Sequence, residues 1–283
     1  MEGPAVPWSE DRYVTANGIR TRYRSAGEGG VPLILLHGLS GTLEDWSETV
    51  AALSRARRVI ALDLLGSGKT DKPPECSYAP DLMRDHVIGV IDALSLDVVD
   101  LDGWSLGGRI ALDVAHAAPD RVRRLVLTAP AGLGPDTFLD LDAPFSVVLG
   151  QALLRPSASG LRIMGNALRN GNGDRLLRFA ARRLYLLKDG GARQGFLGQL
   201  ESLVGRHGFL PGPRRALLAK LPRIETPTLA IWGRQDNFSP FAHSGNLRKL
   251  MPNCRLHVVE RCGHAPQIEW PEIYTAAIED FLA

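Results

Sequence analysis

The stretch that decides the fold is Gly103-Trp104-Ser105-Leu106-Gly107. The residues before it, 97–102, predict a short strand, and the residues after it, 106–117, predict an amphipathic helix. A serine between a strand and a helix lies on a tight, strained turn, where side chains in place of the flanking glycines would collide with the strand and the helix. The turn would hold the Ser105 hydroxyl above a helix N-terminus that favours developing negative charge. Ser105 is therefore the candidate nucleophile.

A serine hydroxyl needs a neighbouring base at neutral pH. Among the seven histidines, the best candidate is His264, in the loop Arg261-Cys262-Gly263-His264-Ala265-Pro266 after an apolar run predicted to be a strand. His37 also ends a predicted strand, but its neighbour Gly38 opens a loop, and we interpret His37 as architectural. No motif around the other five indicates catalysis; they are His86, His116, His207, His243 and His257.

The base needs a carboxylate that holds its tautomer and stabilises the imidazolium ion. Asp236 follows a buried-strand run at 228–232 and the turn that begins at Gly233. Asp63 is the rival, because it also ends a predicted strand. It precedes Ser105 in the chain and is followed by the turn Gly66-Ser67-Gly68, so we expect it to be structural.

An oxyanion hole supplies hydrogen-bond donors where negative charge develops. The backbone N–H of Leu106 is one candidate, because this residue follows the nucleophile at the start of a helix. The backbone N–H of Leu39, in the loop that follows His37, is the second.

Five segments now stand in a recognisable order along nearly the whole chain. They are His37-Gly38, the turn region 63–71, the Ser105 turn, Trp232 to Asp236, and Gly263 to Gln267. The chain resembles serine hydrolases of the α/β-hydrolase fold, of the carboxylesterase and lipase type, with some similarity to meta-cleavage-product hydrolases. The order Ser105, Asp236, His264 is the order of that fold. Haloalkane dehalogenases and epoxide hydrolases share the fold but place an aspartate where this chain has Ser105.

The resemblance and the alternation of predicted strands and helices imply an α/β class of fold. We expect a mainly parallel eight-stranded sheet with helices on both faces. The core domain would comprise residues 1–133 and 223–283, with one helix spanning 43–53. Residues 134–222 show helices and loops without a convincing strand, and we expect them to form a helical lid.

The expected lid is unusually basic. Residues 155–220 contain eleven Arg and two Lys against three acidic residues, a formal charge of 13 − 3 = +10 in a chain of net charge +2. Steering of an anionic substrate and contact with an anionic lipid surface are possible functions, although we favour a solvated basic face. The candidate substrate-pocket residues are Gly38, Trp104, Phe138, Phe145, Met164 and Phe179; the last four could equally pack the lid on the core.

The composition predicts a globular enzyme. The chain has 283 residues, 45% of them hydrophobic and 23% charged, and its net charge of +2 does not favour nucleic acid binding. We find no membrane-spanning run, no signal peptide, and no sequence pattern for a metal or a cofactor. Three cysteines disfavour a disulfide framework, so we expect free thiols and a cytoplasmic protein.

These observations predict a serine hydrolase that cleaves a small to medium carboxylic ester through an acyl-enzyme on Ser105. The alternative is a carbon–carbon bond hydrolase that acts on meta-cleavage products in aromatic catabolism. That family usually has tryptophan where this chain has Ala265, and a glycine-rich loop where it has Leu39. A third possibility, from another class, is a non-enzymatic ligand receptor, which would not need a complete triad.

Overall fold

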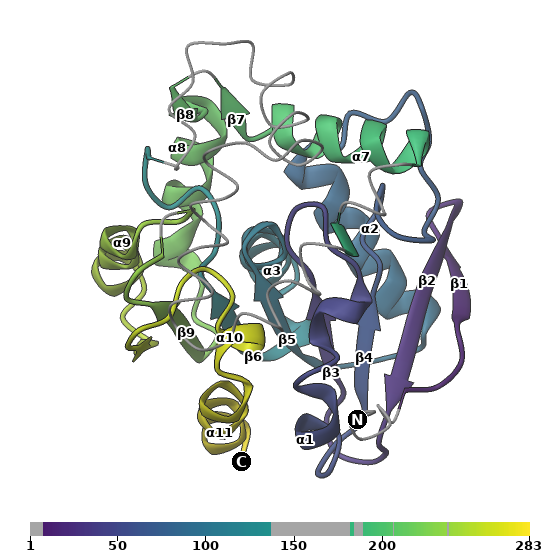
Figure 1. The fold of residues 1–283 in the computed structure, drawn as a ribbon, viewed down its shortest axis with the longest axis horizontal. Helices are drawn as coiled ribbons and strands as arrows, with labels where there is room; N and C mark the ends of the chain where they lie inside the picture. The colour runs from purple at the N-terminus through teal and green to yellow at the C-terminus, as the bar shows by residue number, and fades with distance from the viewer. Residues whose placement is uncertain (1–7, 137–181, 184–188, 206, 237) are drawn as a thin grey trace.

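The computed structural model describes residues 8–136, 182–183, 189–205, 207–236 and 238–283 (Figure 1). Its main sheet has eight strands in the order β1-β2-β4-β3-β5-β6-β9-β10. They are β1 (Arg12–Ala16), β2 (Ile19–Ala26), β3 (Leu33–Leu36), β4 (Val59–Leu62), β5 (Val99–Trp104), β6 (Val122–Thr128), β9 (Thr228–Gly233) and β10 (Cys254–Val259). The pairs β1–β2 and β2–β4 are antiparallel, and all other pairs are parallel. The expected fold class, a mainly parallel eight-stranded sheet in an α/β-hydrolase fold, is confirmed.

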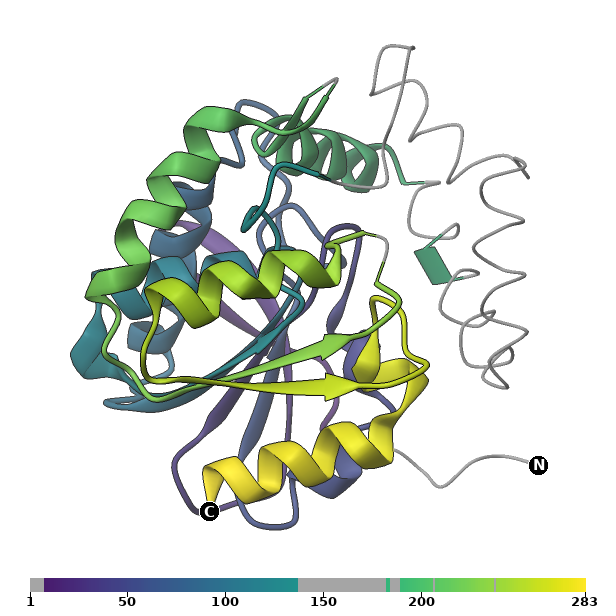
Figure 2. The same ribbon diagram turned by 90° about the vertical axis from the view of Figure 1, so that its left-hand side faces the viewer.

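Helices cover both faces of this sheet (Figure 2). On one side lie α2 (Pro80–Ala93), α3 (Leu106–Ala117), α8 (Pro211–Lys220) and α9 (Ser244–Leu250); on the other lie α1 (Val50–Leu53), α10 (Pro266–Glu269) and α11 (Pro271–Leu282). α7 (Gly190–Glu201) lies over the end of the sheet at which the parallel strands finish (Figure 1). Short 3₁₀ turns complete the described elements: η1 (Leu43–Trp46), η2 (Pro119–Arg121), η3 (Leu221–Arg223) and η4 (Phe241–His243).

Two hydrophobic cores result from the alternation of side chains along each strand. In β3, Ile34 and Leu36 join the core beneath α2 and α3, whereas Leu33 and Leu35 join the core beneath α1 and α11. All four side chains are fully buried. Burial on both faces explains why β3 and β4 are continuous apolar runs instead of alternating patterns.

The predicted helix over 43–53 is two short elements instead, η1 and α1. Between them, the Ser47 hydroxyl donates to the carbonyl of Glu44 at 2.8 Å and the Thr49 hydroxyl donates to the carbonyl of Trp46 at 3.1 Å. Such local bonds from Ser and Thr compete with continuous helical hydrogen bonding.

The expectation of no strand between 134 and 222 is also wrong. A small antiparallel pair, β7 (Val204–Gly205) and β8 (Gly208–Phe209), lies near α7 and α8 and apart from the main sheet (Figure 1). The amide of Leu210 donates to the carbonyl of Leu203 at 2.8 Å and extends this hairpin. Strands of two residues are too short to show a period in the sequence.

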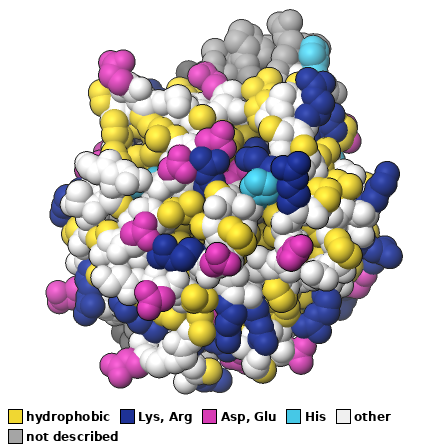
Figure 3. Space-filling model, turned by 180° about the vertical axis from the view of Figure 1, so that it is seen from behind, with side chains coloured by type: hydrophobic (Ala, Val, Ile, Leu, Met, Phe, Trp, Pro, Cys, Tyr) yellow, Lys and Arg dark blue, Asp and Glu magenta, His cyan; other side chains and the backbone are white. Residues whose placement is uncertain are grey.

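Charged groups of both signs are interspersed over most of the face seen in Figure 3. In the described part of the chain, no helix combines the length and the apolar character needed to cross a membrane. Cys76, Cys254 and Cys262 are free thiols, as expected from the sequence.

Candidate active site

Ser105 stands at the junction of β5 and α3 in a strained conformation. Its φ of 55° and ψ of −112° place a non-glycine residue in a region that costs about 1–3 kcal/mol. Three backbone hydrogen bonds hold it there: its amide donates to Thr128 at 2.8 Å, and its carbonyl accepts from Arg109 and Ala131, both at 3.0 Å. The neighbouring elements therefore stabilise a backbone that the serine alone would not adopt.

The glycines around Ser105 are required by close packing of the backbone. A β carbon added at Gly103 would lie 2.3 Å from the carbonyl oxygen of Gly107, and one added at Gly107 would lie 2.1 Å from the carbonyl oxygen of Leu36. Both distances are far shorter than real contacts. Side chains at these positions would therefore collide with the backbone, as expected from the sequence, and the two glycines allow α3 to lie close to β3 and β5.

His264 and Asp236 form a hydrogen-bonded pair at the same edge of the sheet. Nδ1 of His264 lies 2.8 Å from Oδ2 of Asp236. The other carboxylate oxygen, Oδ1, accepts from the amides of Phe238 at 2.8 Å and Ser239 at 3.0 Å. A carboxylate held in this way accepts the Nδ1 proton, which leaves Nε2 of His264 free to act as a base.

The loop that carries His264 is held by a residue that the sequence did not single out. Glu269, in α10, accepts from the amide of Gly263 at 2.8 Å and from the amide of Ala265 at 3.0 Å. Burial raises the pKa of its carboxyl group. Because the two amides flank His264, Glu269 fixes the backbone on both sides of the ring.

Two aromatic residues fix the position of the His264 ring. Phe238 stacks on it with ring centroids 5.1 Å apart, and the ring centroid of Trp104 lies at 5.5 Å. The indole N–H of Trp104 also donates to the carbonyl of His264 at 2.7 Å. Since Trp104 directly precedes Ser105, this contact brings the histidine loop to the serine turn.

The loop after β3 also lies beside Ser105. A β carbon added at Gly38 would lie 3.2 Å from Cβ of Ser105 and 3.0 Å from the ring of Trp104. Among the described residues, the amides of Leu39 and Leu106 have no hydrogen-bond acceptor. Two unused donors beside a serine are what an oxyanion hole requires.

The side chain of His37 holds the loop after β3 in place through two hydrogen bonds. It is fully buried, its Nδ1 donates to the carbonyl of Gly38 at 2.7 Å, and its Nε2 accepts from the amide of Leu64 at 3.0 Å. Burial lowers its pKa, which favours the neutral ring that these bonds need. The ring joins the loops after β3 and β4, in agreement with an architectural role.

The carboxylate of Asp63 is fully engaged in hydrogen bonds that hold neighbouring loops and β2 together. Its carboxylate accepts from the amides of Leu43 and Lys69, each at 2.8 Å, and from the guanidinium of Arg22 at 3.0 Å. These contacts leave Asp236 as the carboxylate that lies against His264.

The candidate pocket residues divide into two groups. Gly38 and Trp104 lie beside Ser105, whereas Phe138, Phe145, Met164 and Phe179 lie outside the described residues.

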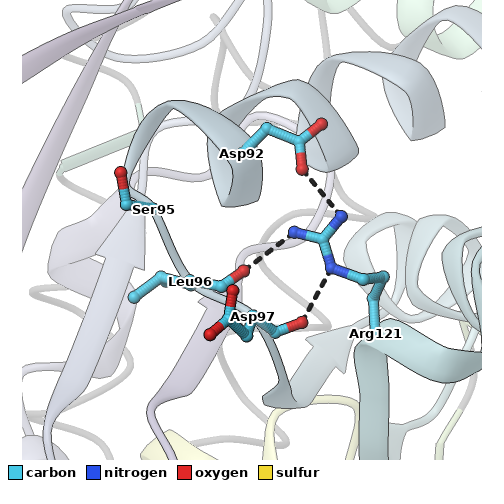
Figure 4. A pocket seen from close by; sticks show the side chains of 5 residues that line it. All are labelled: Asp92, Ser95, Leu96, Asp97 and Arg121. Atoms are coloured by element: carbon cyan, nitrogen blue, oxygen red, sulfur yellow. Dashed lines mark hydrogen bonds and ion pairs between the residues drawn. The ribbon is translucent and has the colours of Figure 1, made fainter.

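A separate surface pocket surrounds Arg121 and the chain just before β5, at the opposite end of that strand from Ser105 (Figure 4). The guanidinium there is already bound by Asp92 and by the carbonyls of Leu96 and Asp97. Within the described ranges, no His, Cys, Asp or Glu side chains are grouped as metal ligands would be.

The sheet and the geometry at its edge define an α/β hydrolase. Residues 31–271 match the model of the alpha/beta hydrolase fold family, and the chain belongs to this family.

Individual relatives cover the chain from end to end. It is 33% identical to the 2-hydroxymuconate semialdehyde hydrolase of Pseudomonas sp. (strain CF600) over an alignment 297 positions long, which covers 100% of this chain and 97% of that protein. It is also 33% identical to a 2-hydroxy-6-oxo-2,4-heptadienoate hydrolase of Pseudomonas putida, covering 96% of each chain. The solved structure of a mutant of the meta-cleavage product hydrolase from Pseudomonas fluorescens IP01 superposes with a TM-score of 0.73 and 29% identity, over 95% of this chain and 96% of that one.

Proposed function

We propose that this protein hydrolyses a carbon–carbon bond in ring-cleavage products of aromatic catabolism, with Ser105, His264 and Asp236 as its catalytic triad. The observation that carries the proposal is the His264–Asp236 pair at 2.8 Å beside a strained Ser105. The choice of bond is supported by full-length relatives at 33% identity that are named as hydrolases of such compounds. These relatives favour the alternative from the sequence over the ester hydrolase.

The site offers each group that this chemistry needs. His264 would take a proton from Ser105 or from a water beside it, so that the oxygen attacks the ketone carbon. The amides of Leu39 and Leu106 would stabilise the oxyanion. When the carbon–carbon bond breaks, the carbon that leaves would take the proton held by His264. A 2-hydroxydienoate suits this step, because its conjugated oxygen can share the negative charge that develops on the leaving carbon. Where Ser105 is the nucleophile, a water deprotonated by His264 would then hydrolyse the acyl-enzyme and free the serine.

The proposal also covers the part of the chain between the two halves of the core. We propose that residues 134–222 form a lid on a core of residues 1–133 and 223–283. The excess of Arg in residues 155–220 would favour entry of a substrate with a carboxylate.

Ester hydrolysis is the second candidate, for a specific reason. Leu39 and Ala265 depart from the pattern of the carbon–carbon hydrolases, and Ala265 is buried in the core beneath α11. A small residue there leaves the His264 loop without the tryptophan of that family, so its substrate contacts would differ.

The test compares two substrates on the same enzyme. We expect a larger kcat/KM for 2-hydroxy-6-oxo-2,4-heptadienoate, followed by loss of its visible absorbance, than for p-nitrophenyl acetate. Ser105→Ala should fold normally by circular dichroism and lose turnover of both. A preference for the ester would make the protein an esterase. A folded wild type that turns over neither, yet binds the dienoate in calorimetry, would favour the ligand receptor.

A further inference from the structure

A buried ion pair joins the segment before α7 to the turn that follows the oxyanion loop. Arg183 donates to both carboxylate oxygens of Asp45, in η1, at 2.8 and 2.7 Å. The side chain of Arg183 is 6% exposed and that of Asp45 is fully buried. The neighbouring Arg182 donates to the backbone carbonyl of Glu44 at 2.6 Å, so two consecutive arginines contact η1.

The Asp45 carboxylate also supports the loop that carries Leu39. Its Oδ2 accepts from the amide of Thr42 at 3.3 Å. A β carbon added at Gly41 would lie 2.5 Å from this oxygen and 2.7 Å from Nδ1 of His37. The loop of residues 37–42 is therefore folded directly over the carboxylate, and it has little room to move without displacing it.

Arg183 extends this contact to the serine turn. The carbon of its guanidinium lies 5.4 Å from the ring centroid of Trp104, the residue before Ser105. The same ring packs against Gly38 and donates to the carbonyl of His264. One buried cation therefore contacts Trp104, at the end of β5 directly before Ser105, and through Asp45 it also contacts the loop that carries Leu39.

We propose that Asp45 and Arg183 are positioning residues for the oxyanion hole. The pair holds the Leu39 amide in line with the Leu106 amide, so the hole is complete only while Arg183 is seated on η1. This inference rests on the serine-hydrolase chemistry of the proposed function, and it is independent of which bond is cleaved.

The chemistry of the pair indicates how its loss would act. Removal of one partner leaves an uncompensated buried charge, which recruits water or shifts its surroundings. The loop of residues 37–42 contacts the Asp45 carboxylate through the amide of Thr42, so a shift of this carboxylate would displace the loop. A misplaced oxyanion donor weakens binding of the transition state more than binding of the substrate, so kcat falls while KM changes little.

The test uses Asp45→Asn, Arg183→Met and the double variant. Each is assayed with neutral p-nitrophenyl acetate and with the anionic dienoate. We expect each single variant to lose about 10- to 100-fold in kcat on both substrates, with KM nearly unchanged. The double variant should be no worse than the worse single variant, because the pair acts as a unit. Arg183→Lys should recover part of the loss, since it keeps the charge without the two parallel bonds.

Asp100→Asn is the matched control. Asp100 is a fully buried aspartate at the start of β5, and it pairs with Arg123 through both carboxylate oxygens, far from the loop. It should lower the free energy of unfolding without changing kcat per folded molecule. If Asp45→Asn behaves in the same way, the pair is only structural and the proposal is wrong. It is also wrong if Arg183→Met raises KM for the dienoate alone while Asp45→Asn has no effect.

Failure of the proposed function remains distinguishable from failure of this inference. If the wild type cleaves only the ester, the choice of carbon–carbon bond is wrong, but the pair is still tested on the ester. If neither substrate is turned over, the rate at which a p-nitrophenyl alkylphosphonate labels Ser105, followed by intact mass, gives the same comparison. Equal labelling rates in wild type and Asp45→Asn, or no labelling of the wild type, would overturn the proposal.

Discussion

At the scale of single residues, two aspartates show how context decides a role. Asp63 and Asp236 both follow parallel strands at the edge of the sheet that holds Ser105. Asp63 faces Arg22 and two amides, whereas Asp236 shares its oxygens between two amides and the His264 ring. The residue type and its place after a strand are the same, and only the partners differ.

We predict that Asp236→Asn lowers kcat by about 10⁴-fold, because the amide no longer holds His264 in the tautomer that leaves Nε2 free. Steady-state kinetics on the better of the two substrates measures the loss. Asp63→Asn is the control: it should lower the free energy of unfolding and leave kcat per folded molecule unchanged. The opposite pattern would transfer the role of the acid to Asp63.

At the scale of elements, β3, β5 and α3 can pack closely only because Gly103 and Gly107 have no side chains. We predict that Gly107→Ala costs about 3 kcal/mol or more in the free energy of unfolding, because its β carbon would meet the backbone of Leu36. Urea denaturation measures this cost.

The matched control for this substitution is Gly245→Ala. Gly245 lies in α9, where an added β carbon has no atom within 4 Å. That variant should be neutral or stabilised by up to about 1 kcal/mol. Equal effects at the two positions would mean that packing at the serine turn is not tight.

Local patterns in the sequence were sufficient for the elements that follow one period. The apolar runs of β3, β4 and β9 and the helix after Ser105 could be read from neighbouring residues alone. β5 begins at Val99, later than the predicted 97, because the carbonyls of Leu96 and Asp97 accept from Arg121. These hydrogen bonds of Arg121 join residues that are 24 or more positions apart, so no local sequence pattern predicts them.

The residues of the candidate site also fall into two groups, those that a local motif predicts and those that no local motif predicts. Ser105, Asp236 and His264 each carry a local motif, so all three could be proposed in advance. The supports of the site could not. Glu269 looks like any acidic residue near a helix end, and Arg183 meets Asp45 across a separation of 138 residues.

At the scale of the whole molecule, one buried carboxyl group should make stability depend on pH. Asp102, in β5, accepts from the hydroxyl of Tyr274 at 2.7 Å, and Tyr274 also bonds Thr128 at 2.8 Å. Complete burial raises the pKa of Asp102 to about 7. The folded state therefore holds a proton that the unfolded chain releases near its ordinary pKa of 3.8.

A raised pKa contributes stability that is present at low pH and is lost as pH rises from about 4 through 7. We predict that Asp102→Asn abolishes this loss, so that the variant gains stability relative to wild type between pH 4 and pH 8, by up to roughly 4 kcal/mol. Urea unfolding of both proteins across this range measures the difference. His86, whose pKa burial lowers to about 4, has the opposite trend but is common to both proteins. A difference that is constant with pH would contradict the prediction.

The strained backbone of Ser105 makes catalytic activity and folding stability favour different residues at this position. Glycine would adopt the same φ of 55° at little cost. Selection for heat resistance alone would therefore favour glycine at position 105 and would discard the hydroxyl. The serine persists only where a lineage benefits from what that hydroxyl does, so a strained backbone at position 105 is also a record of past selection for activity.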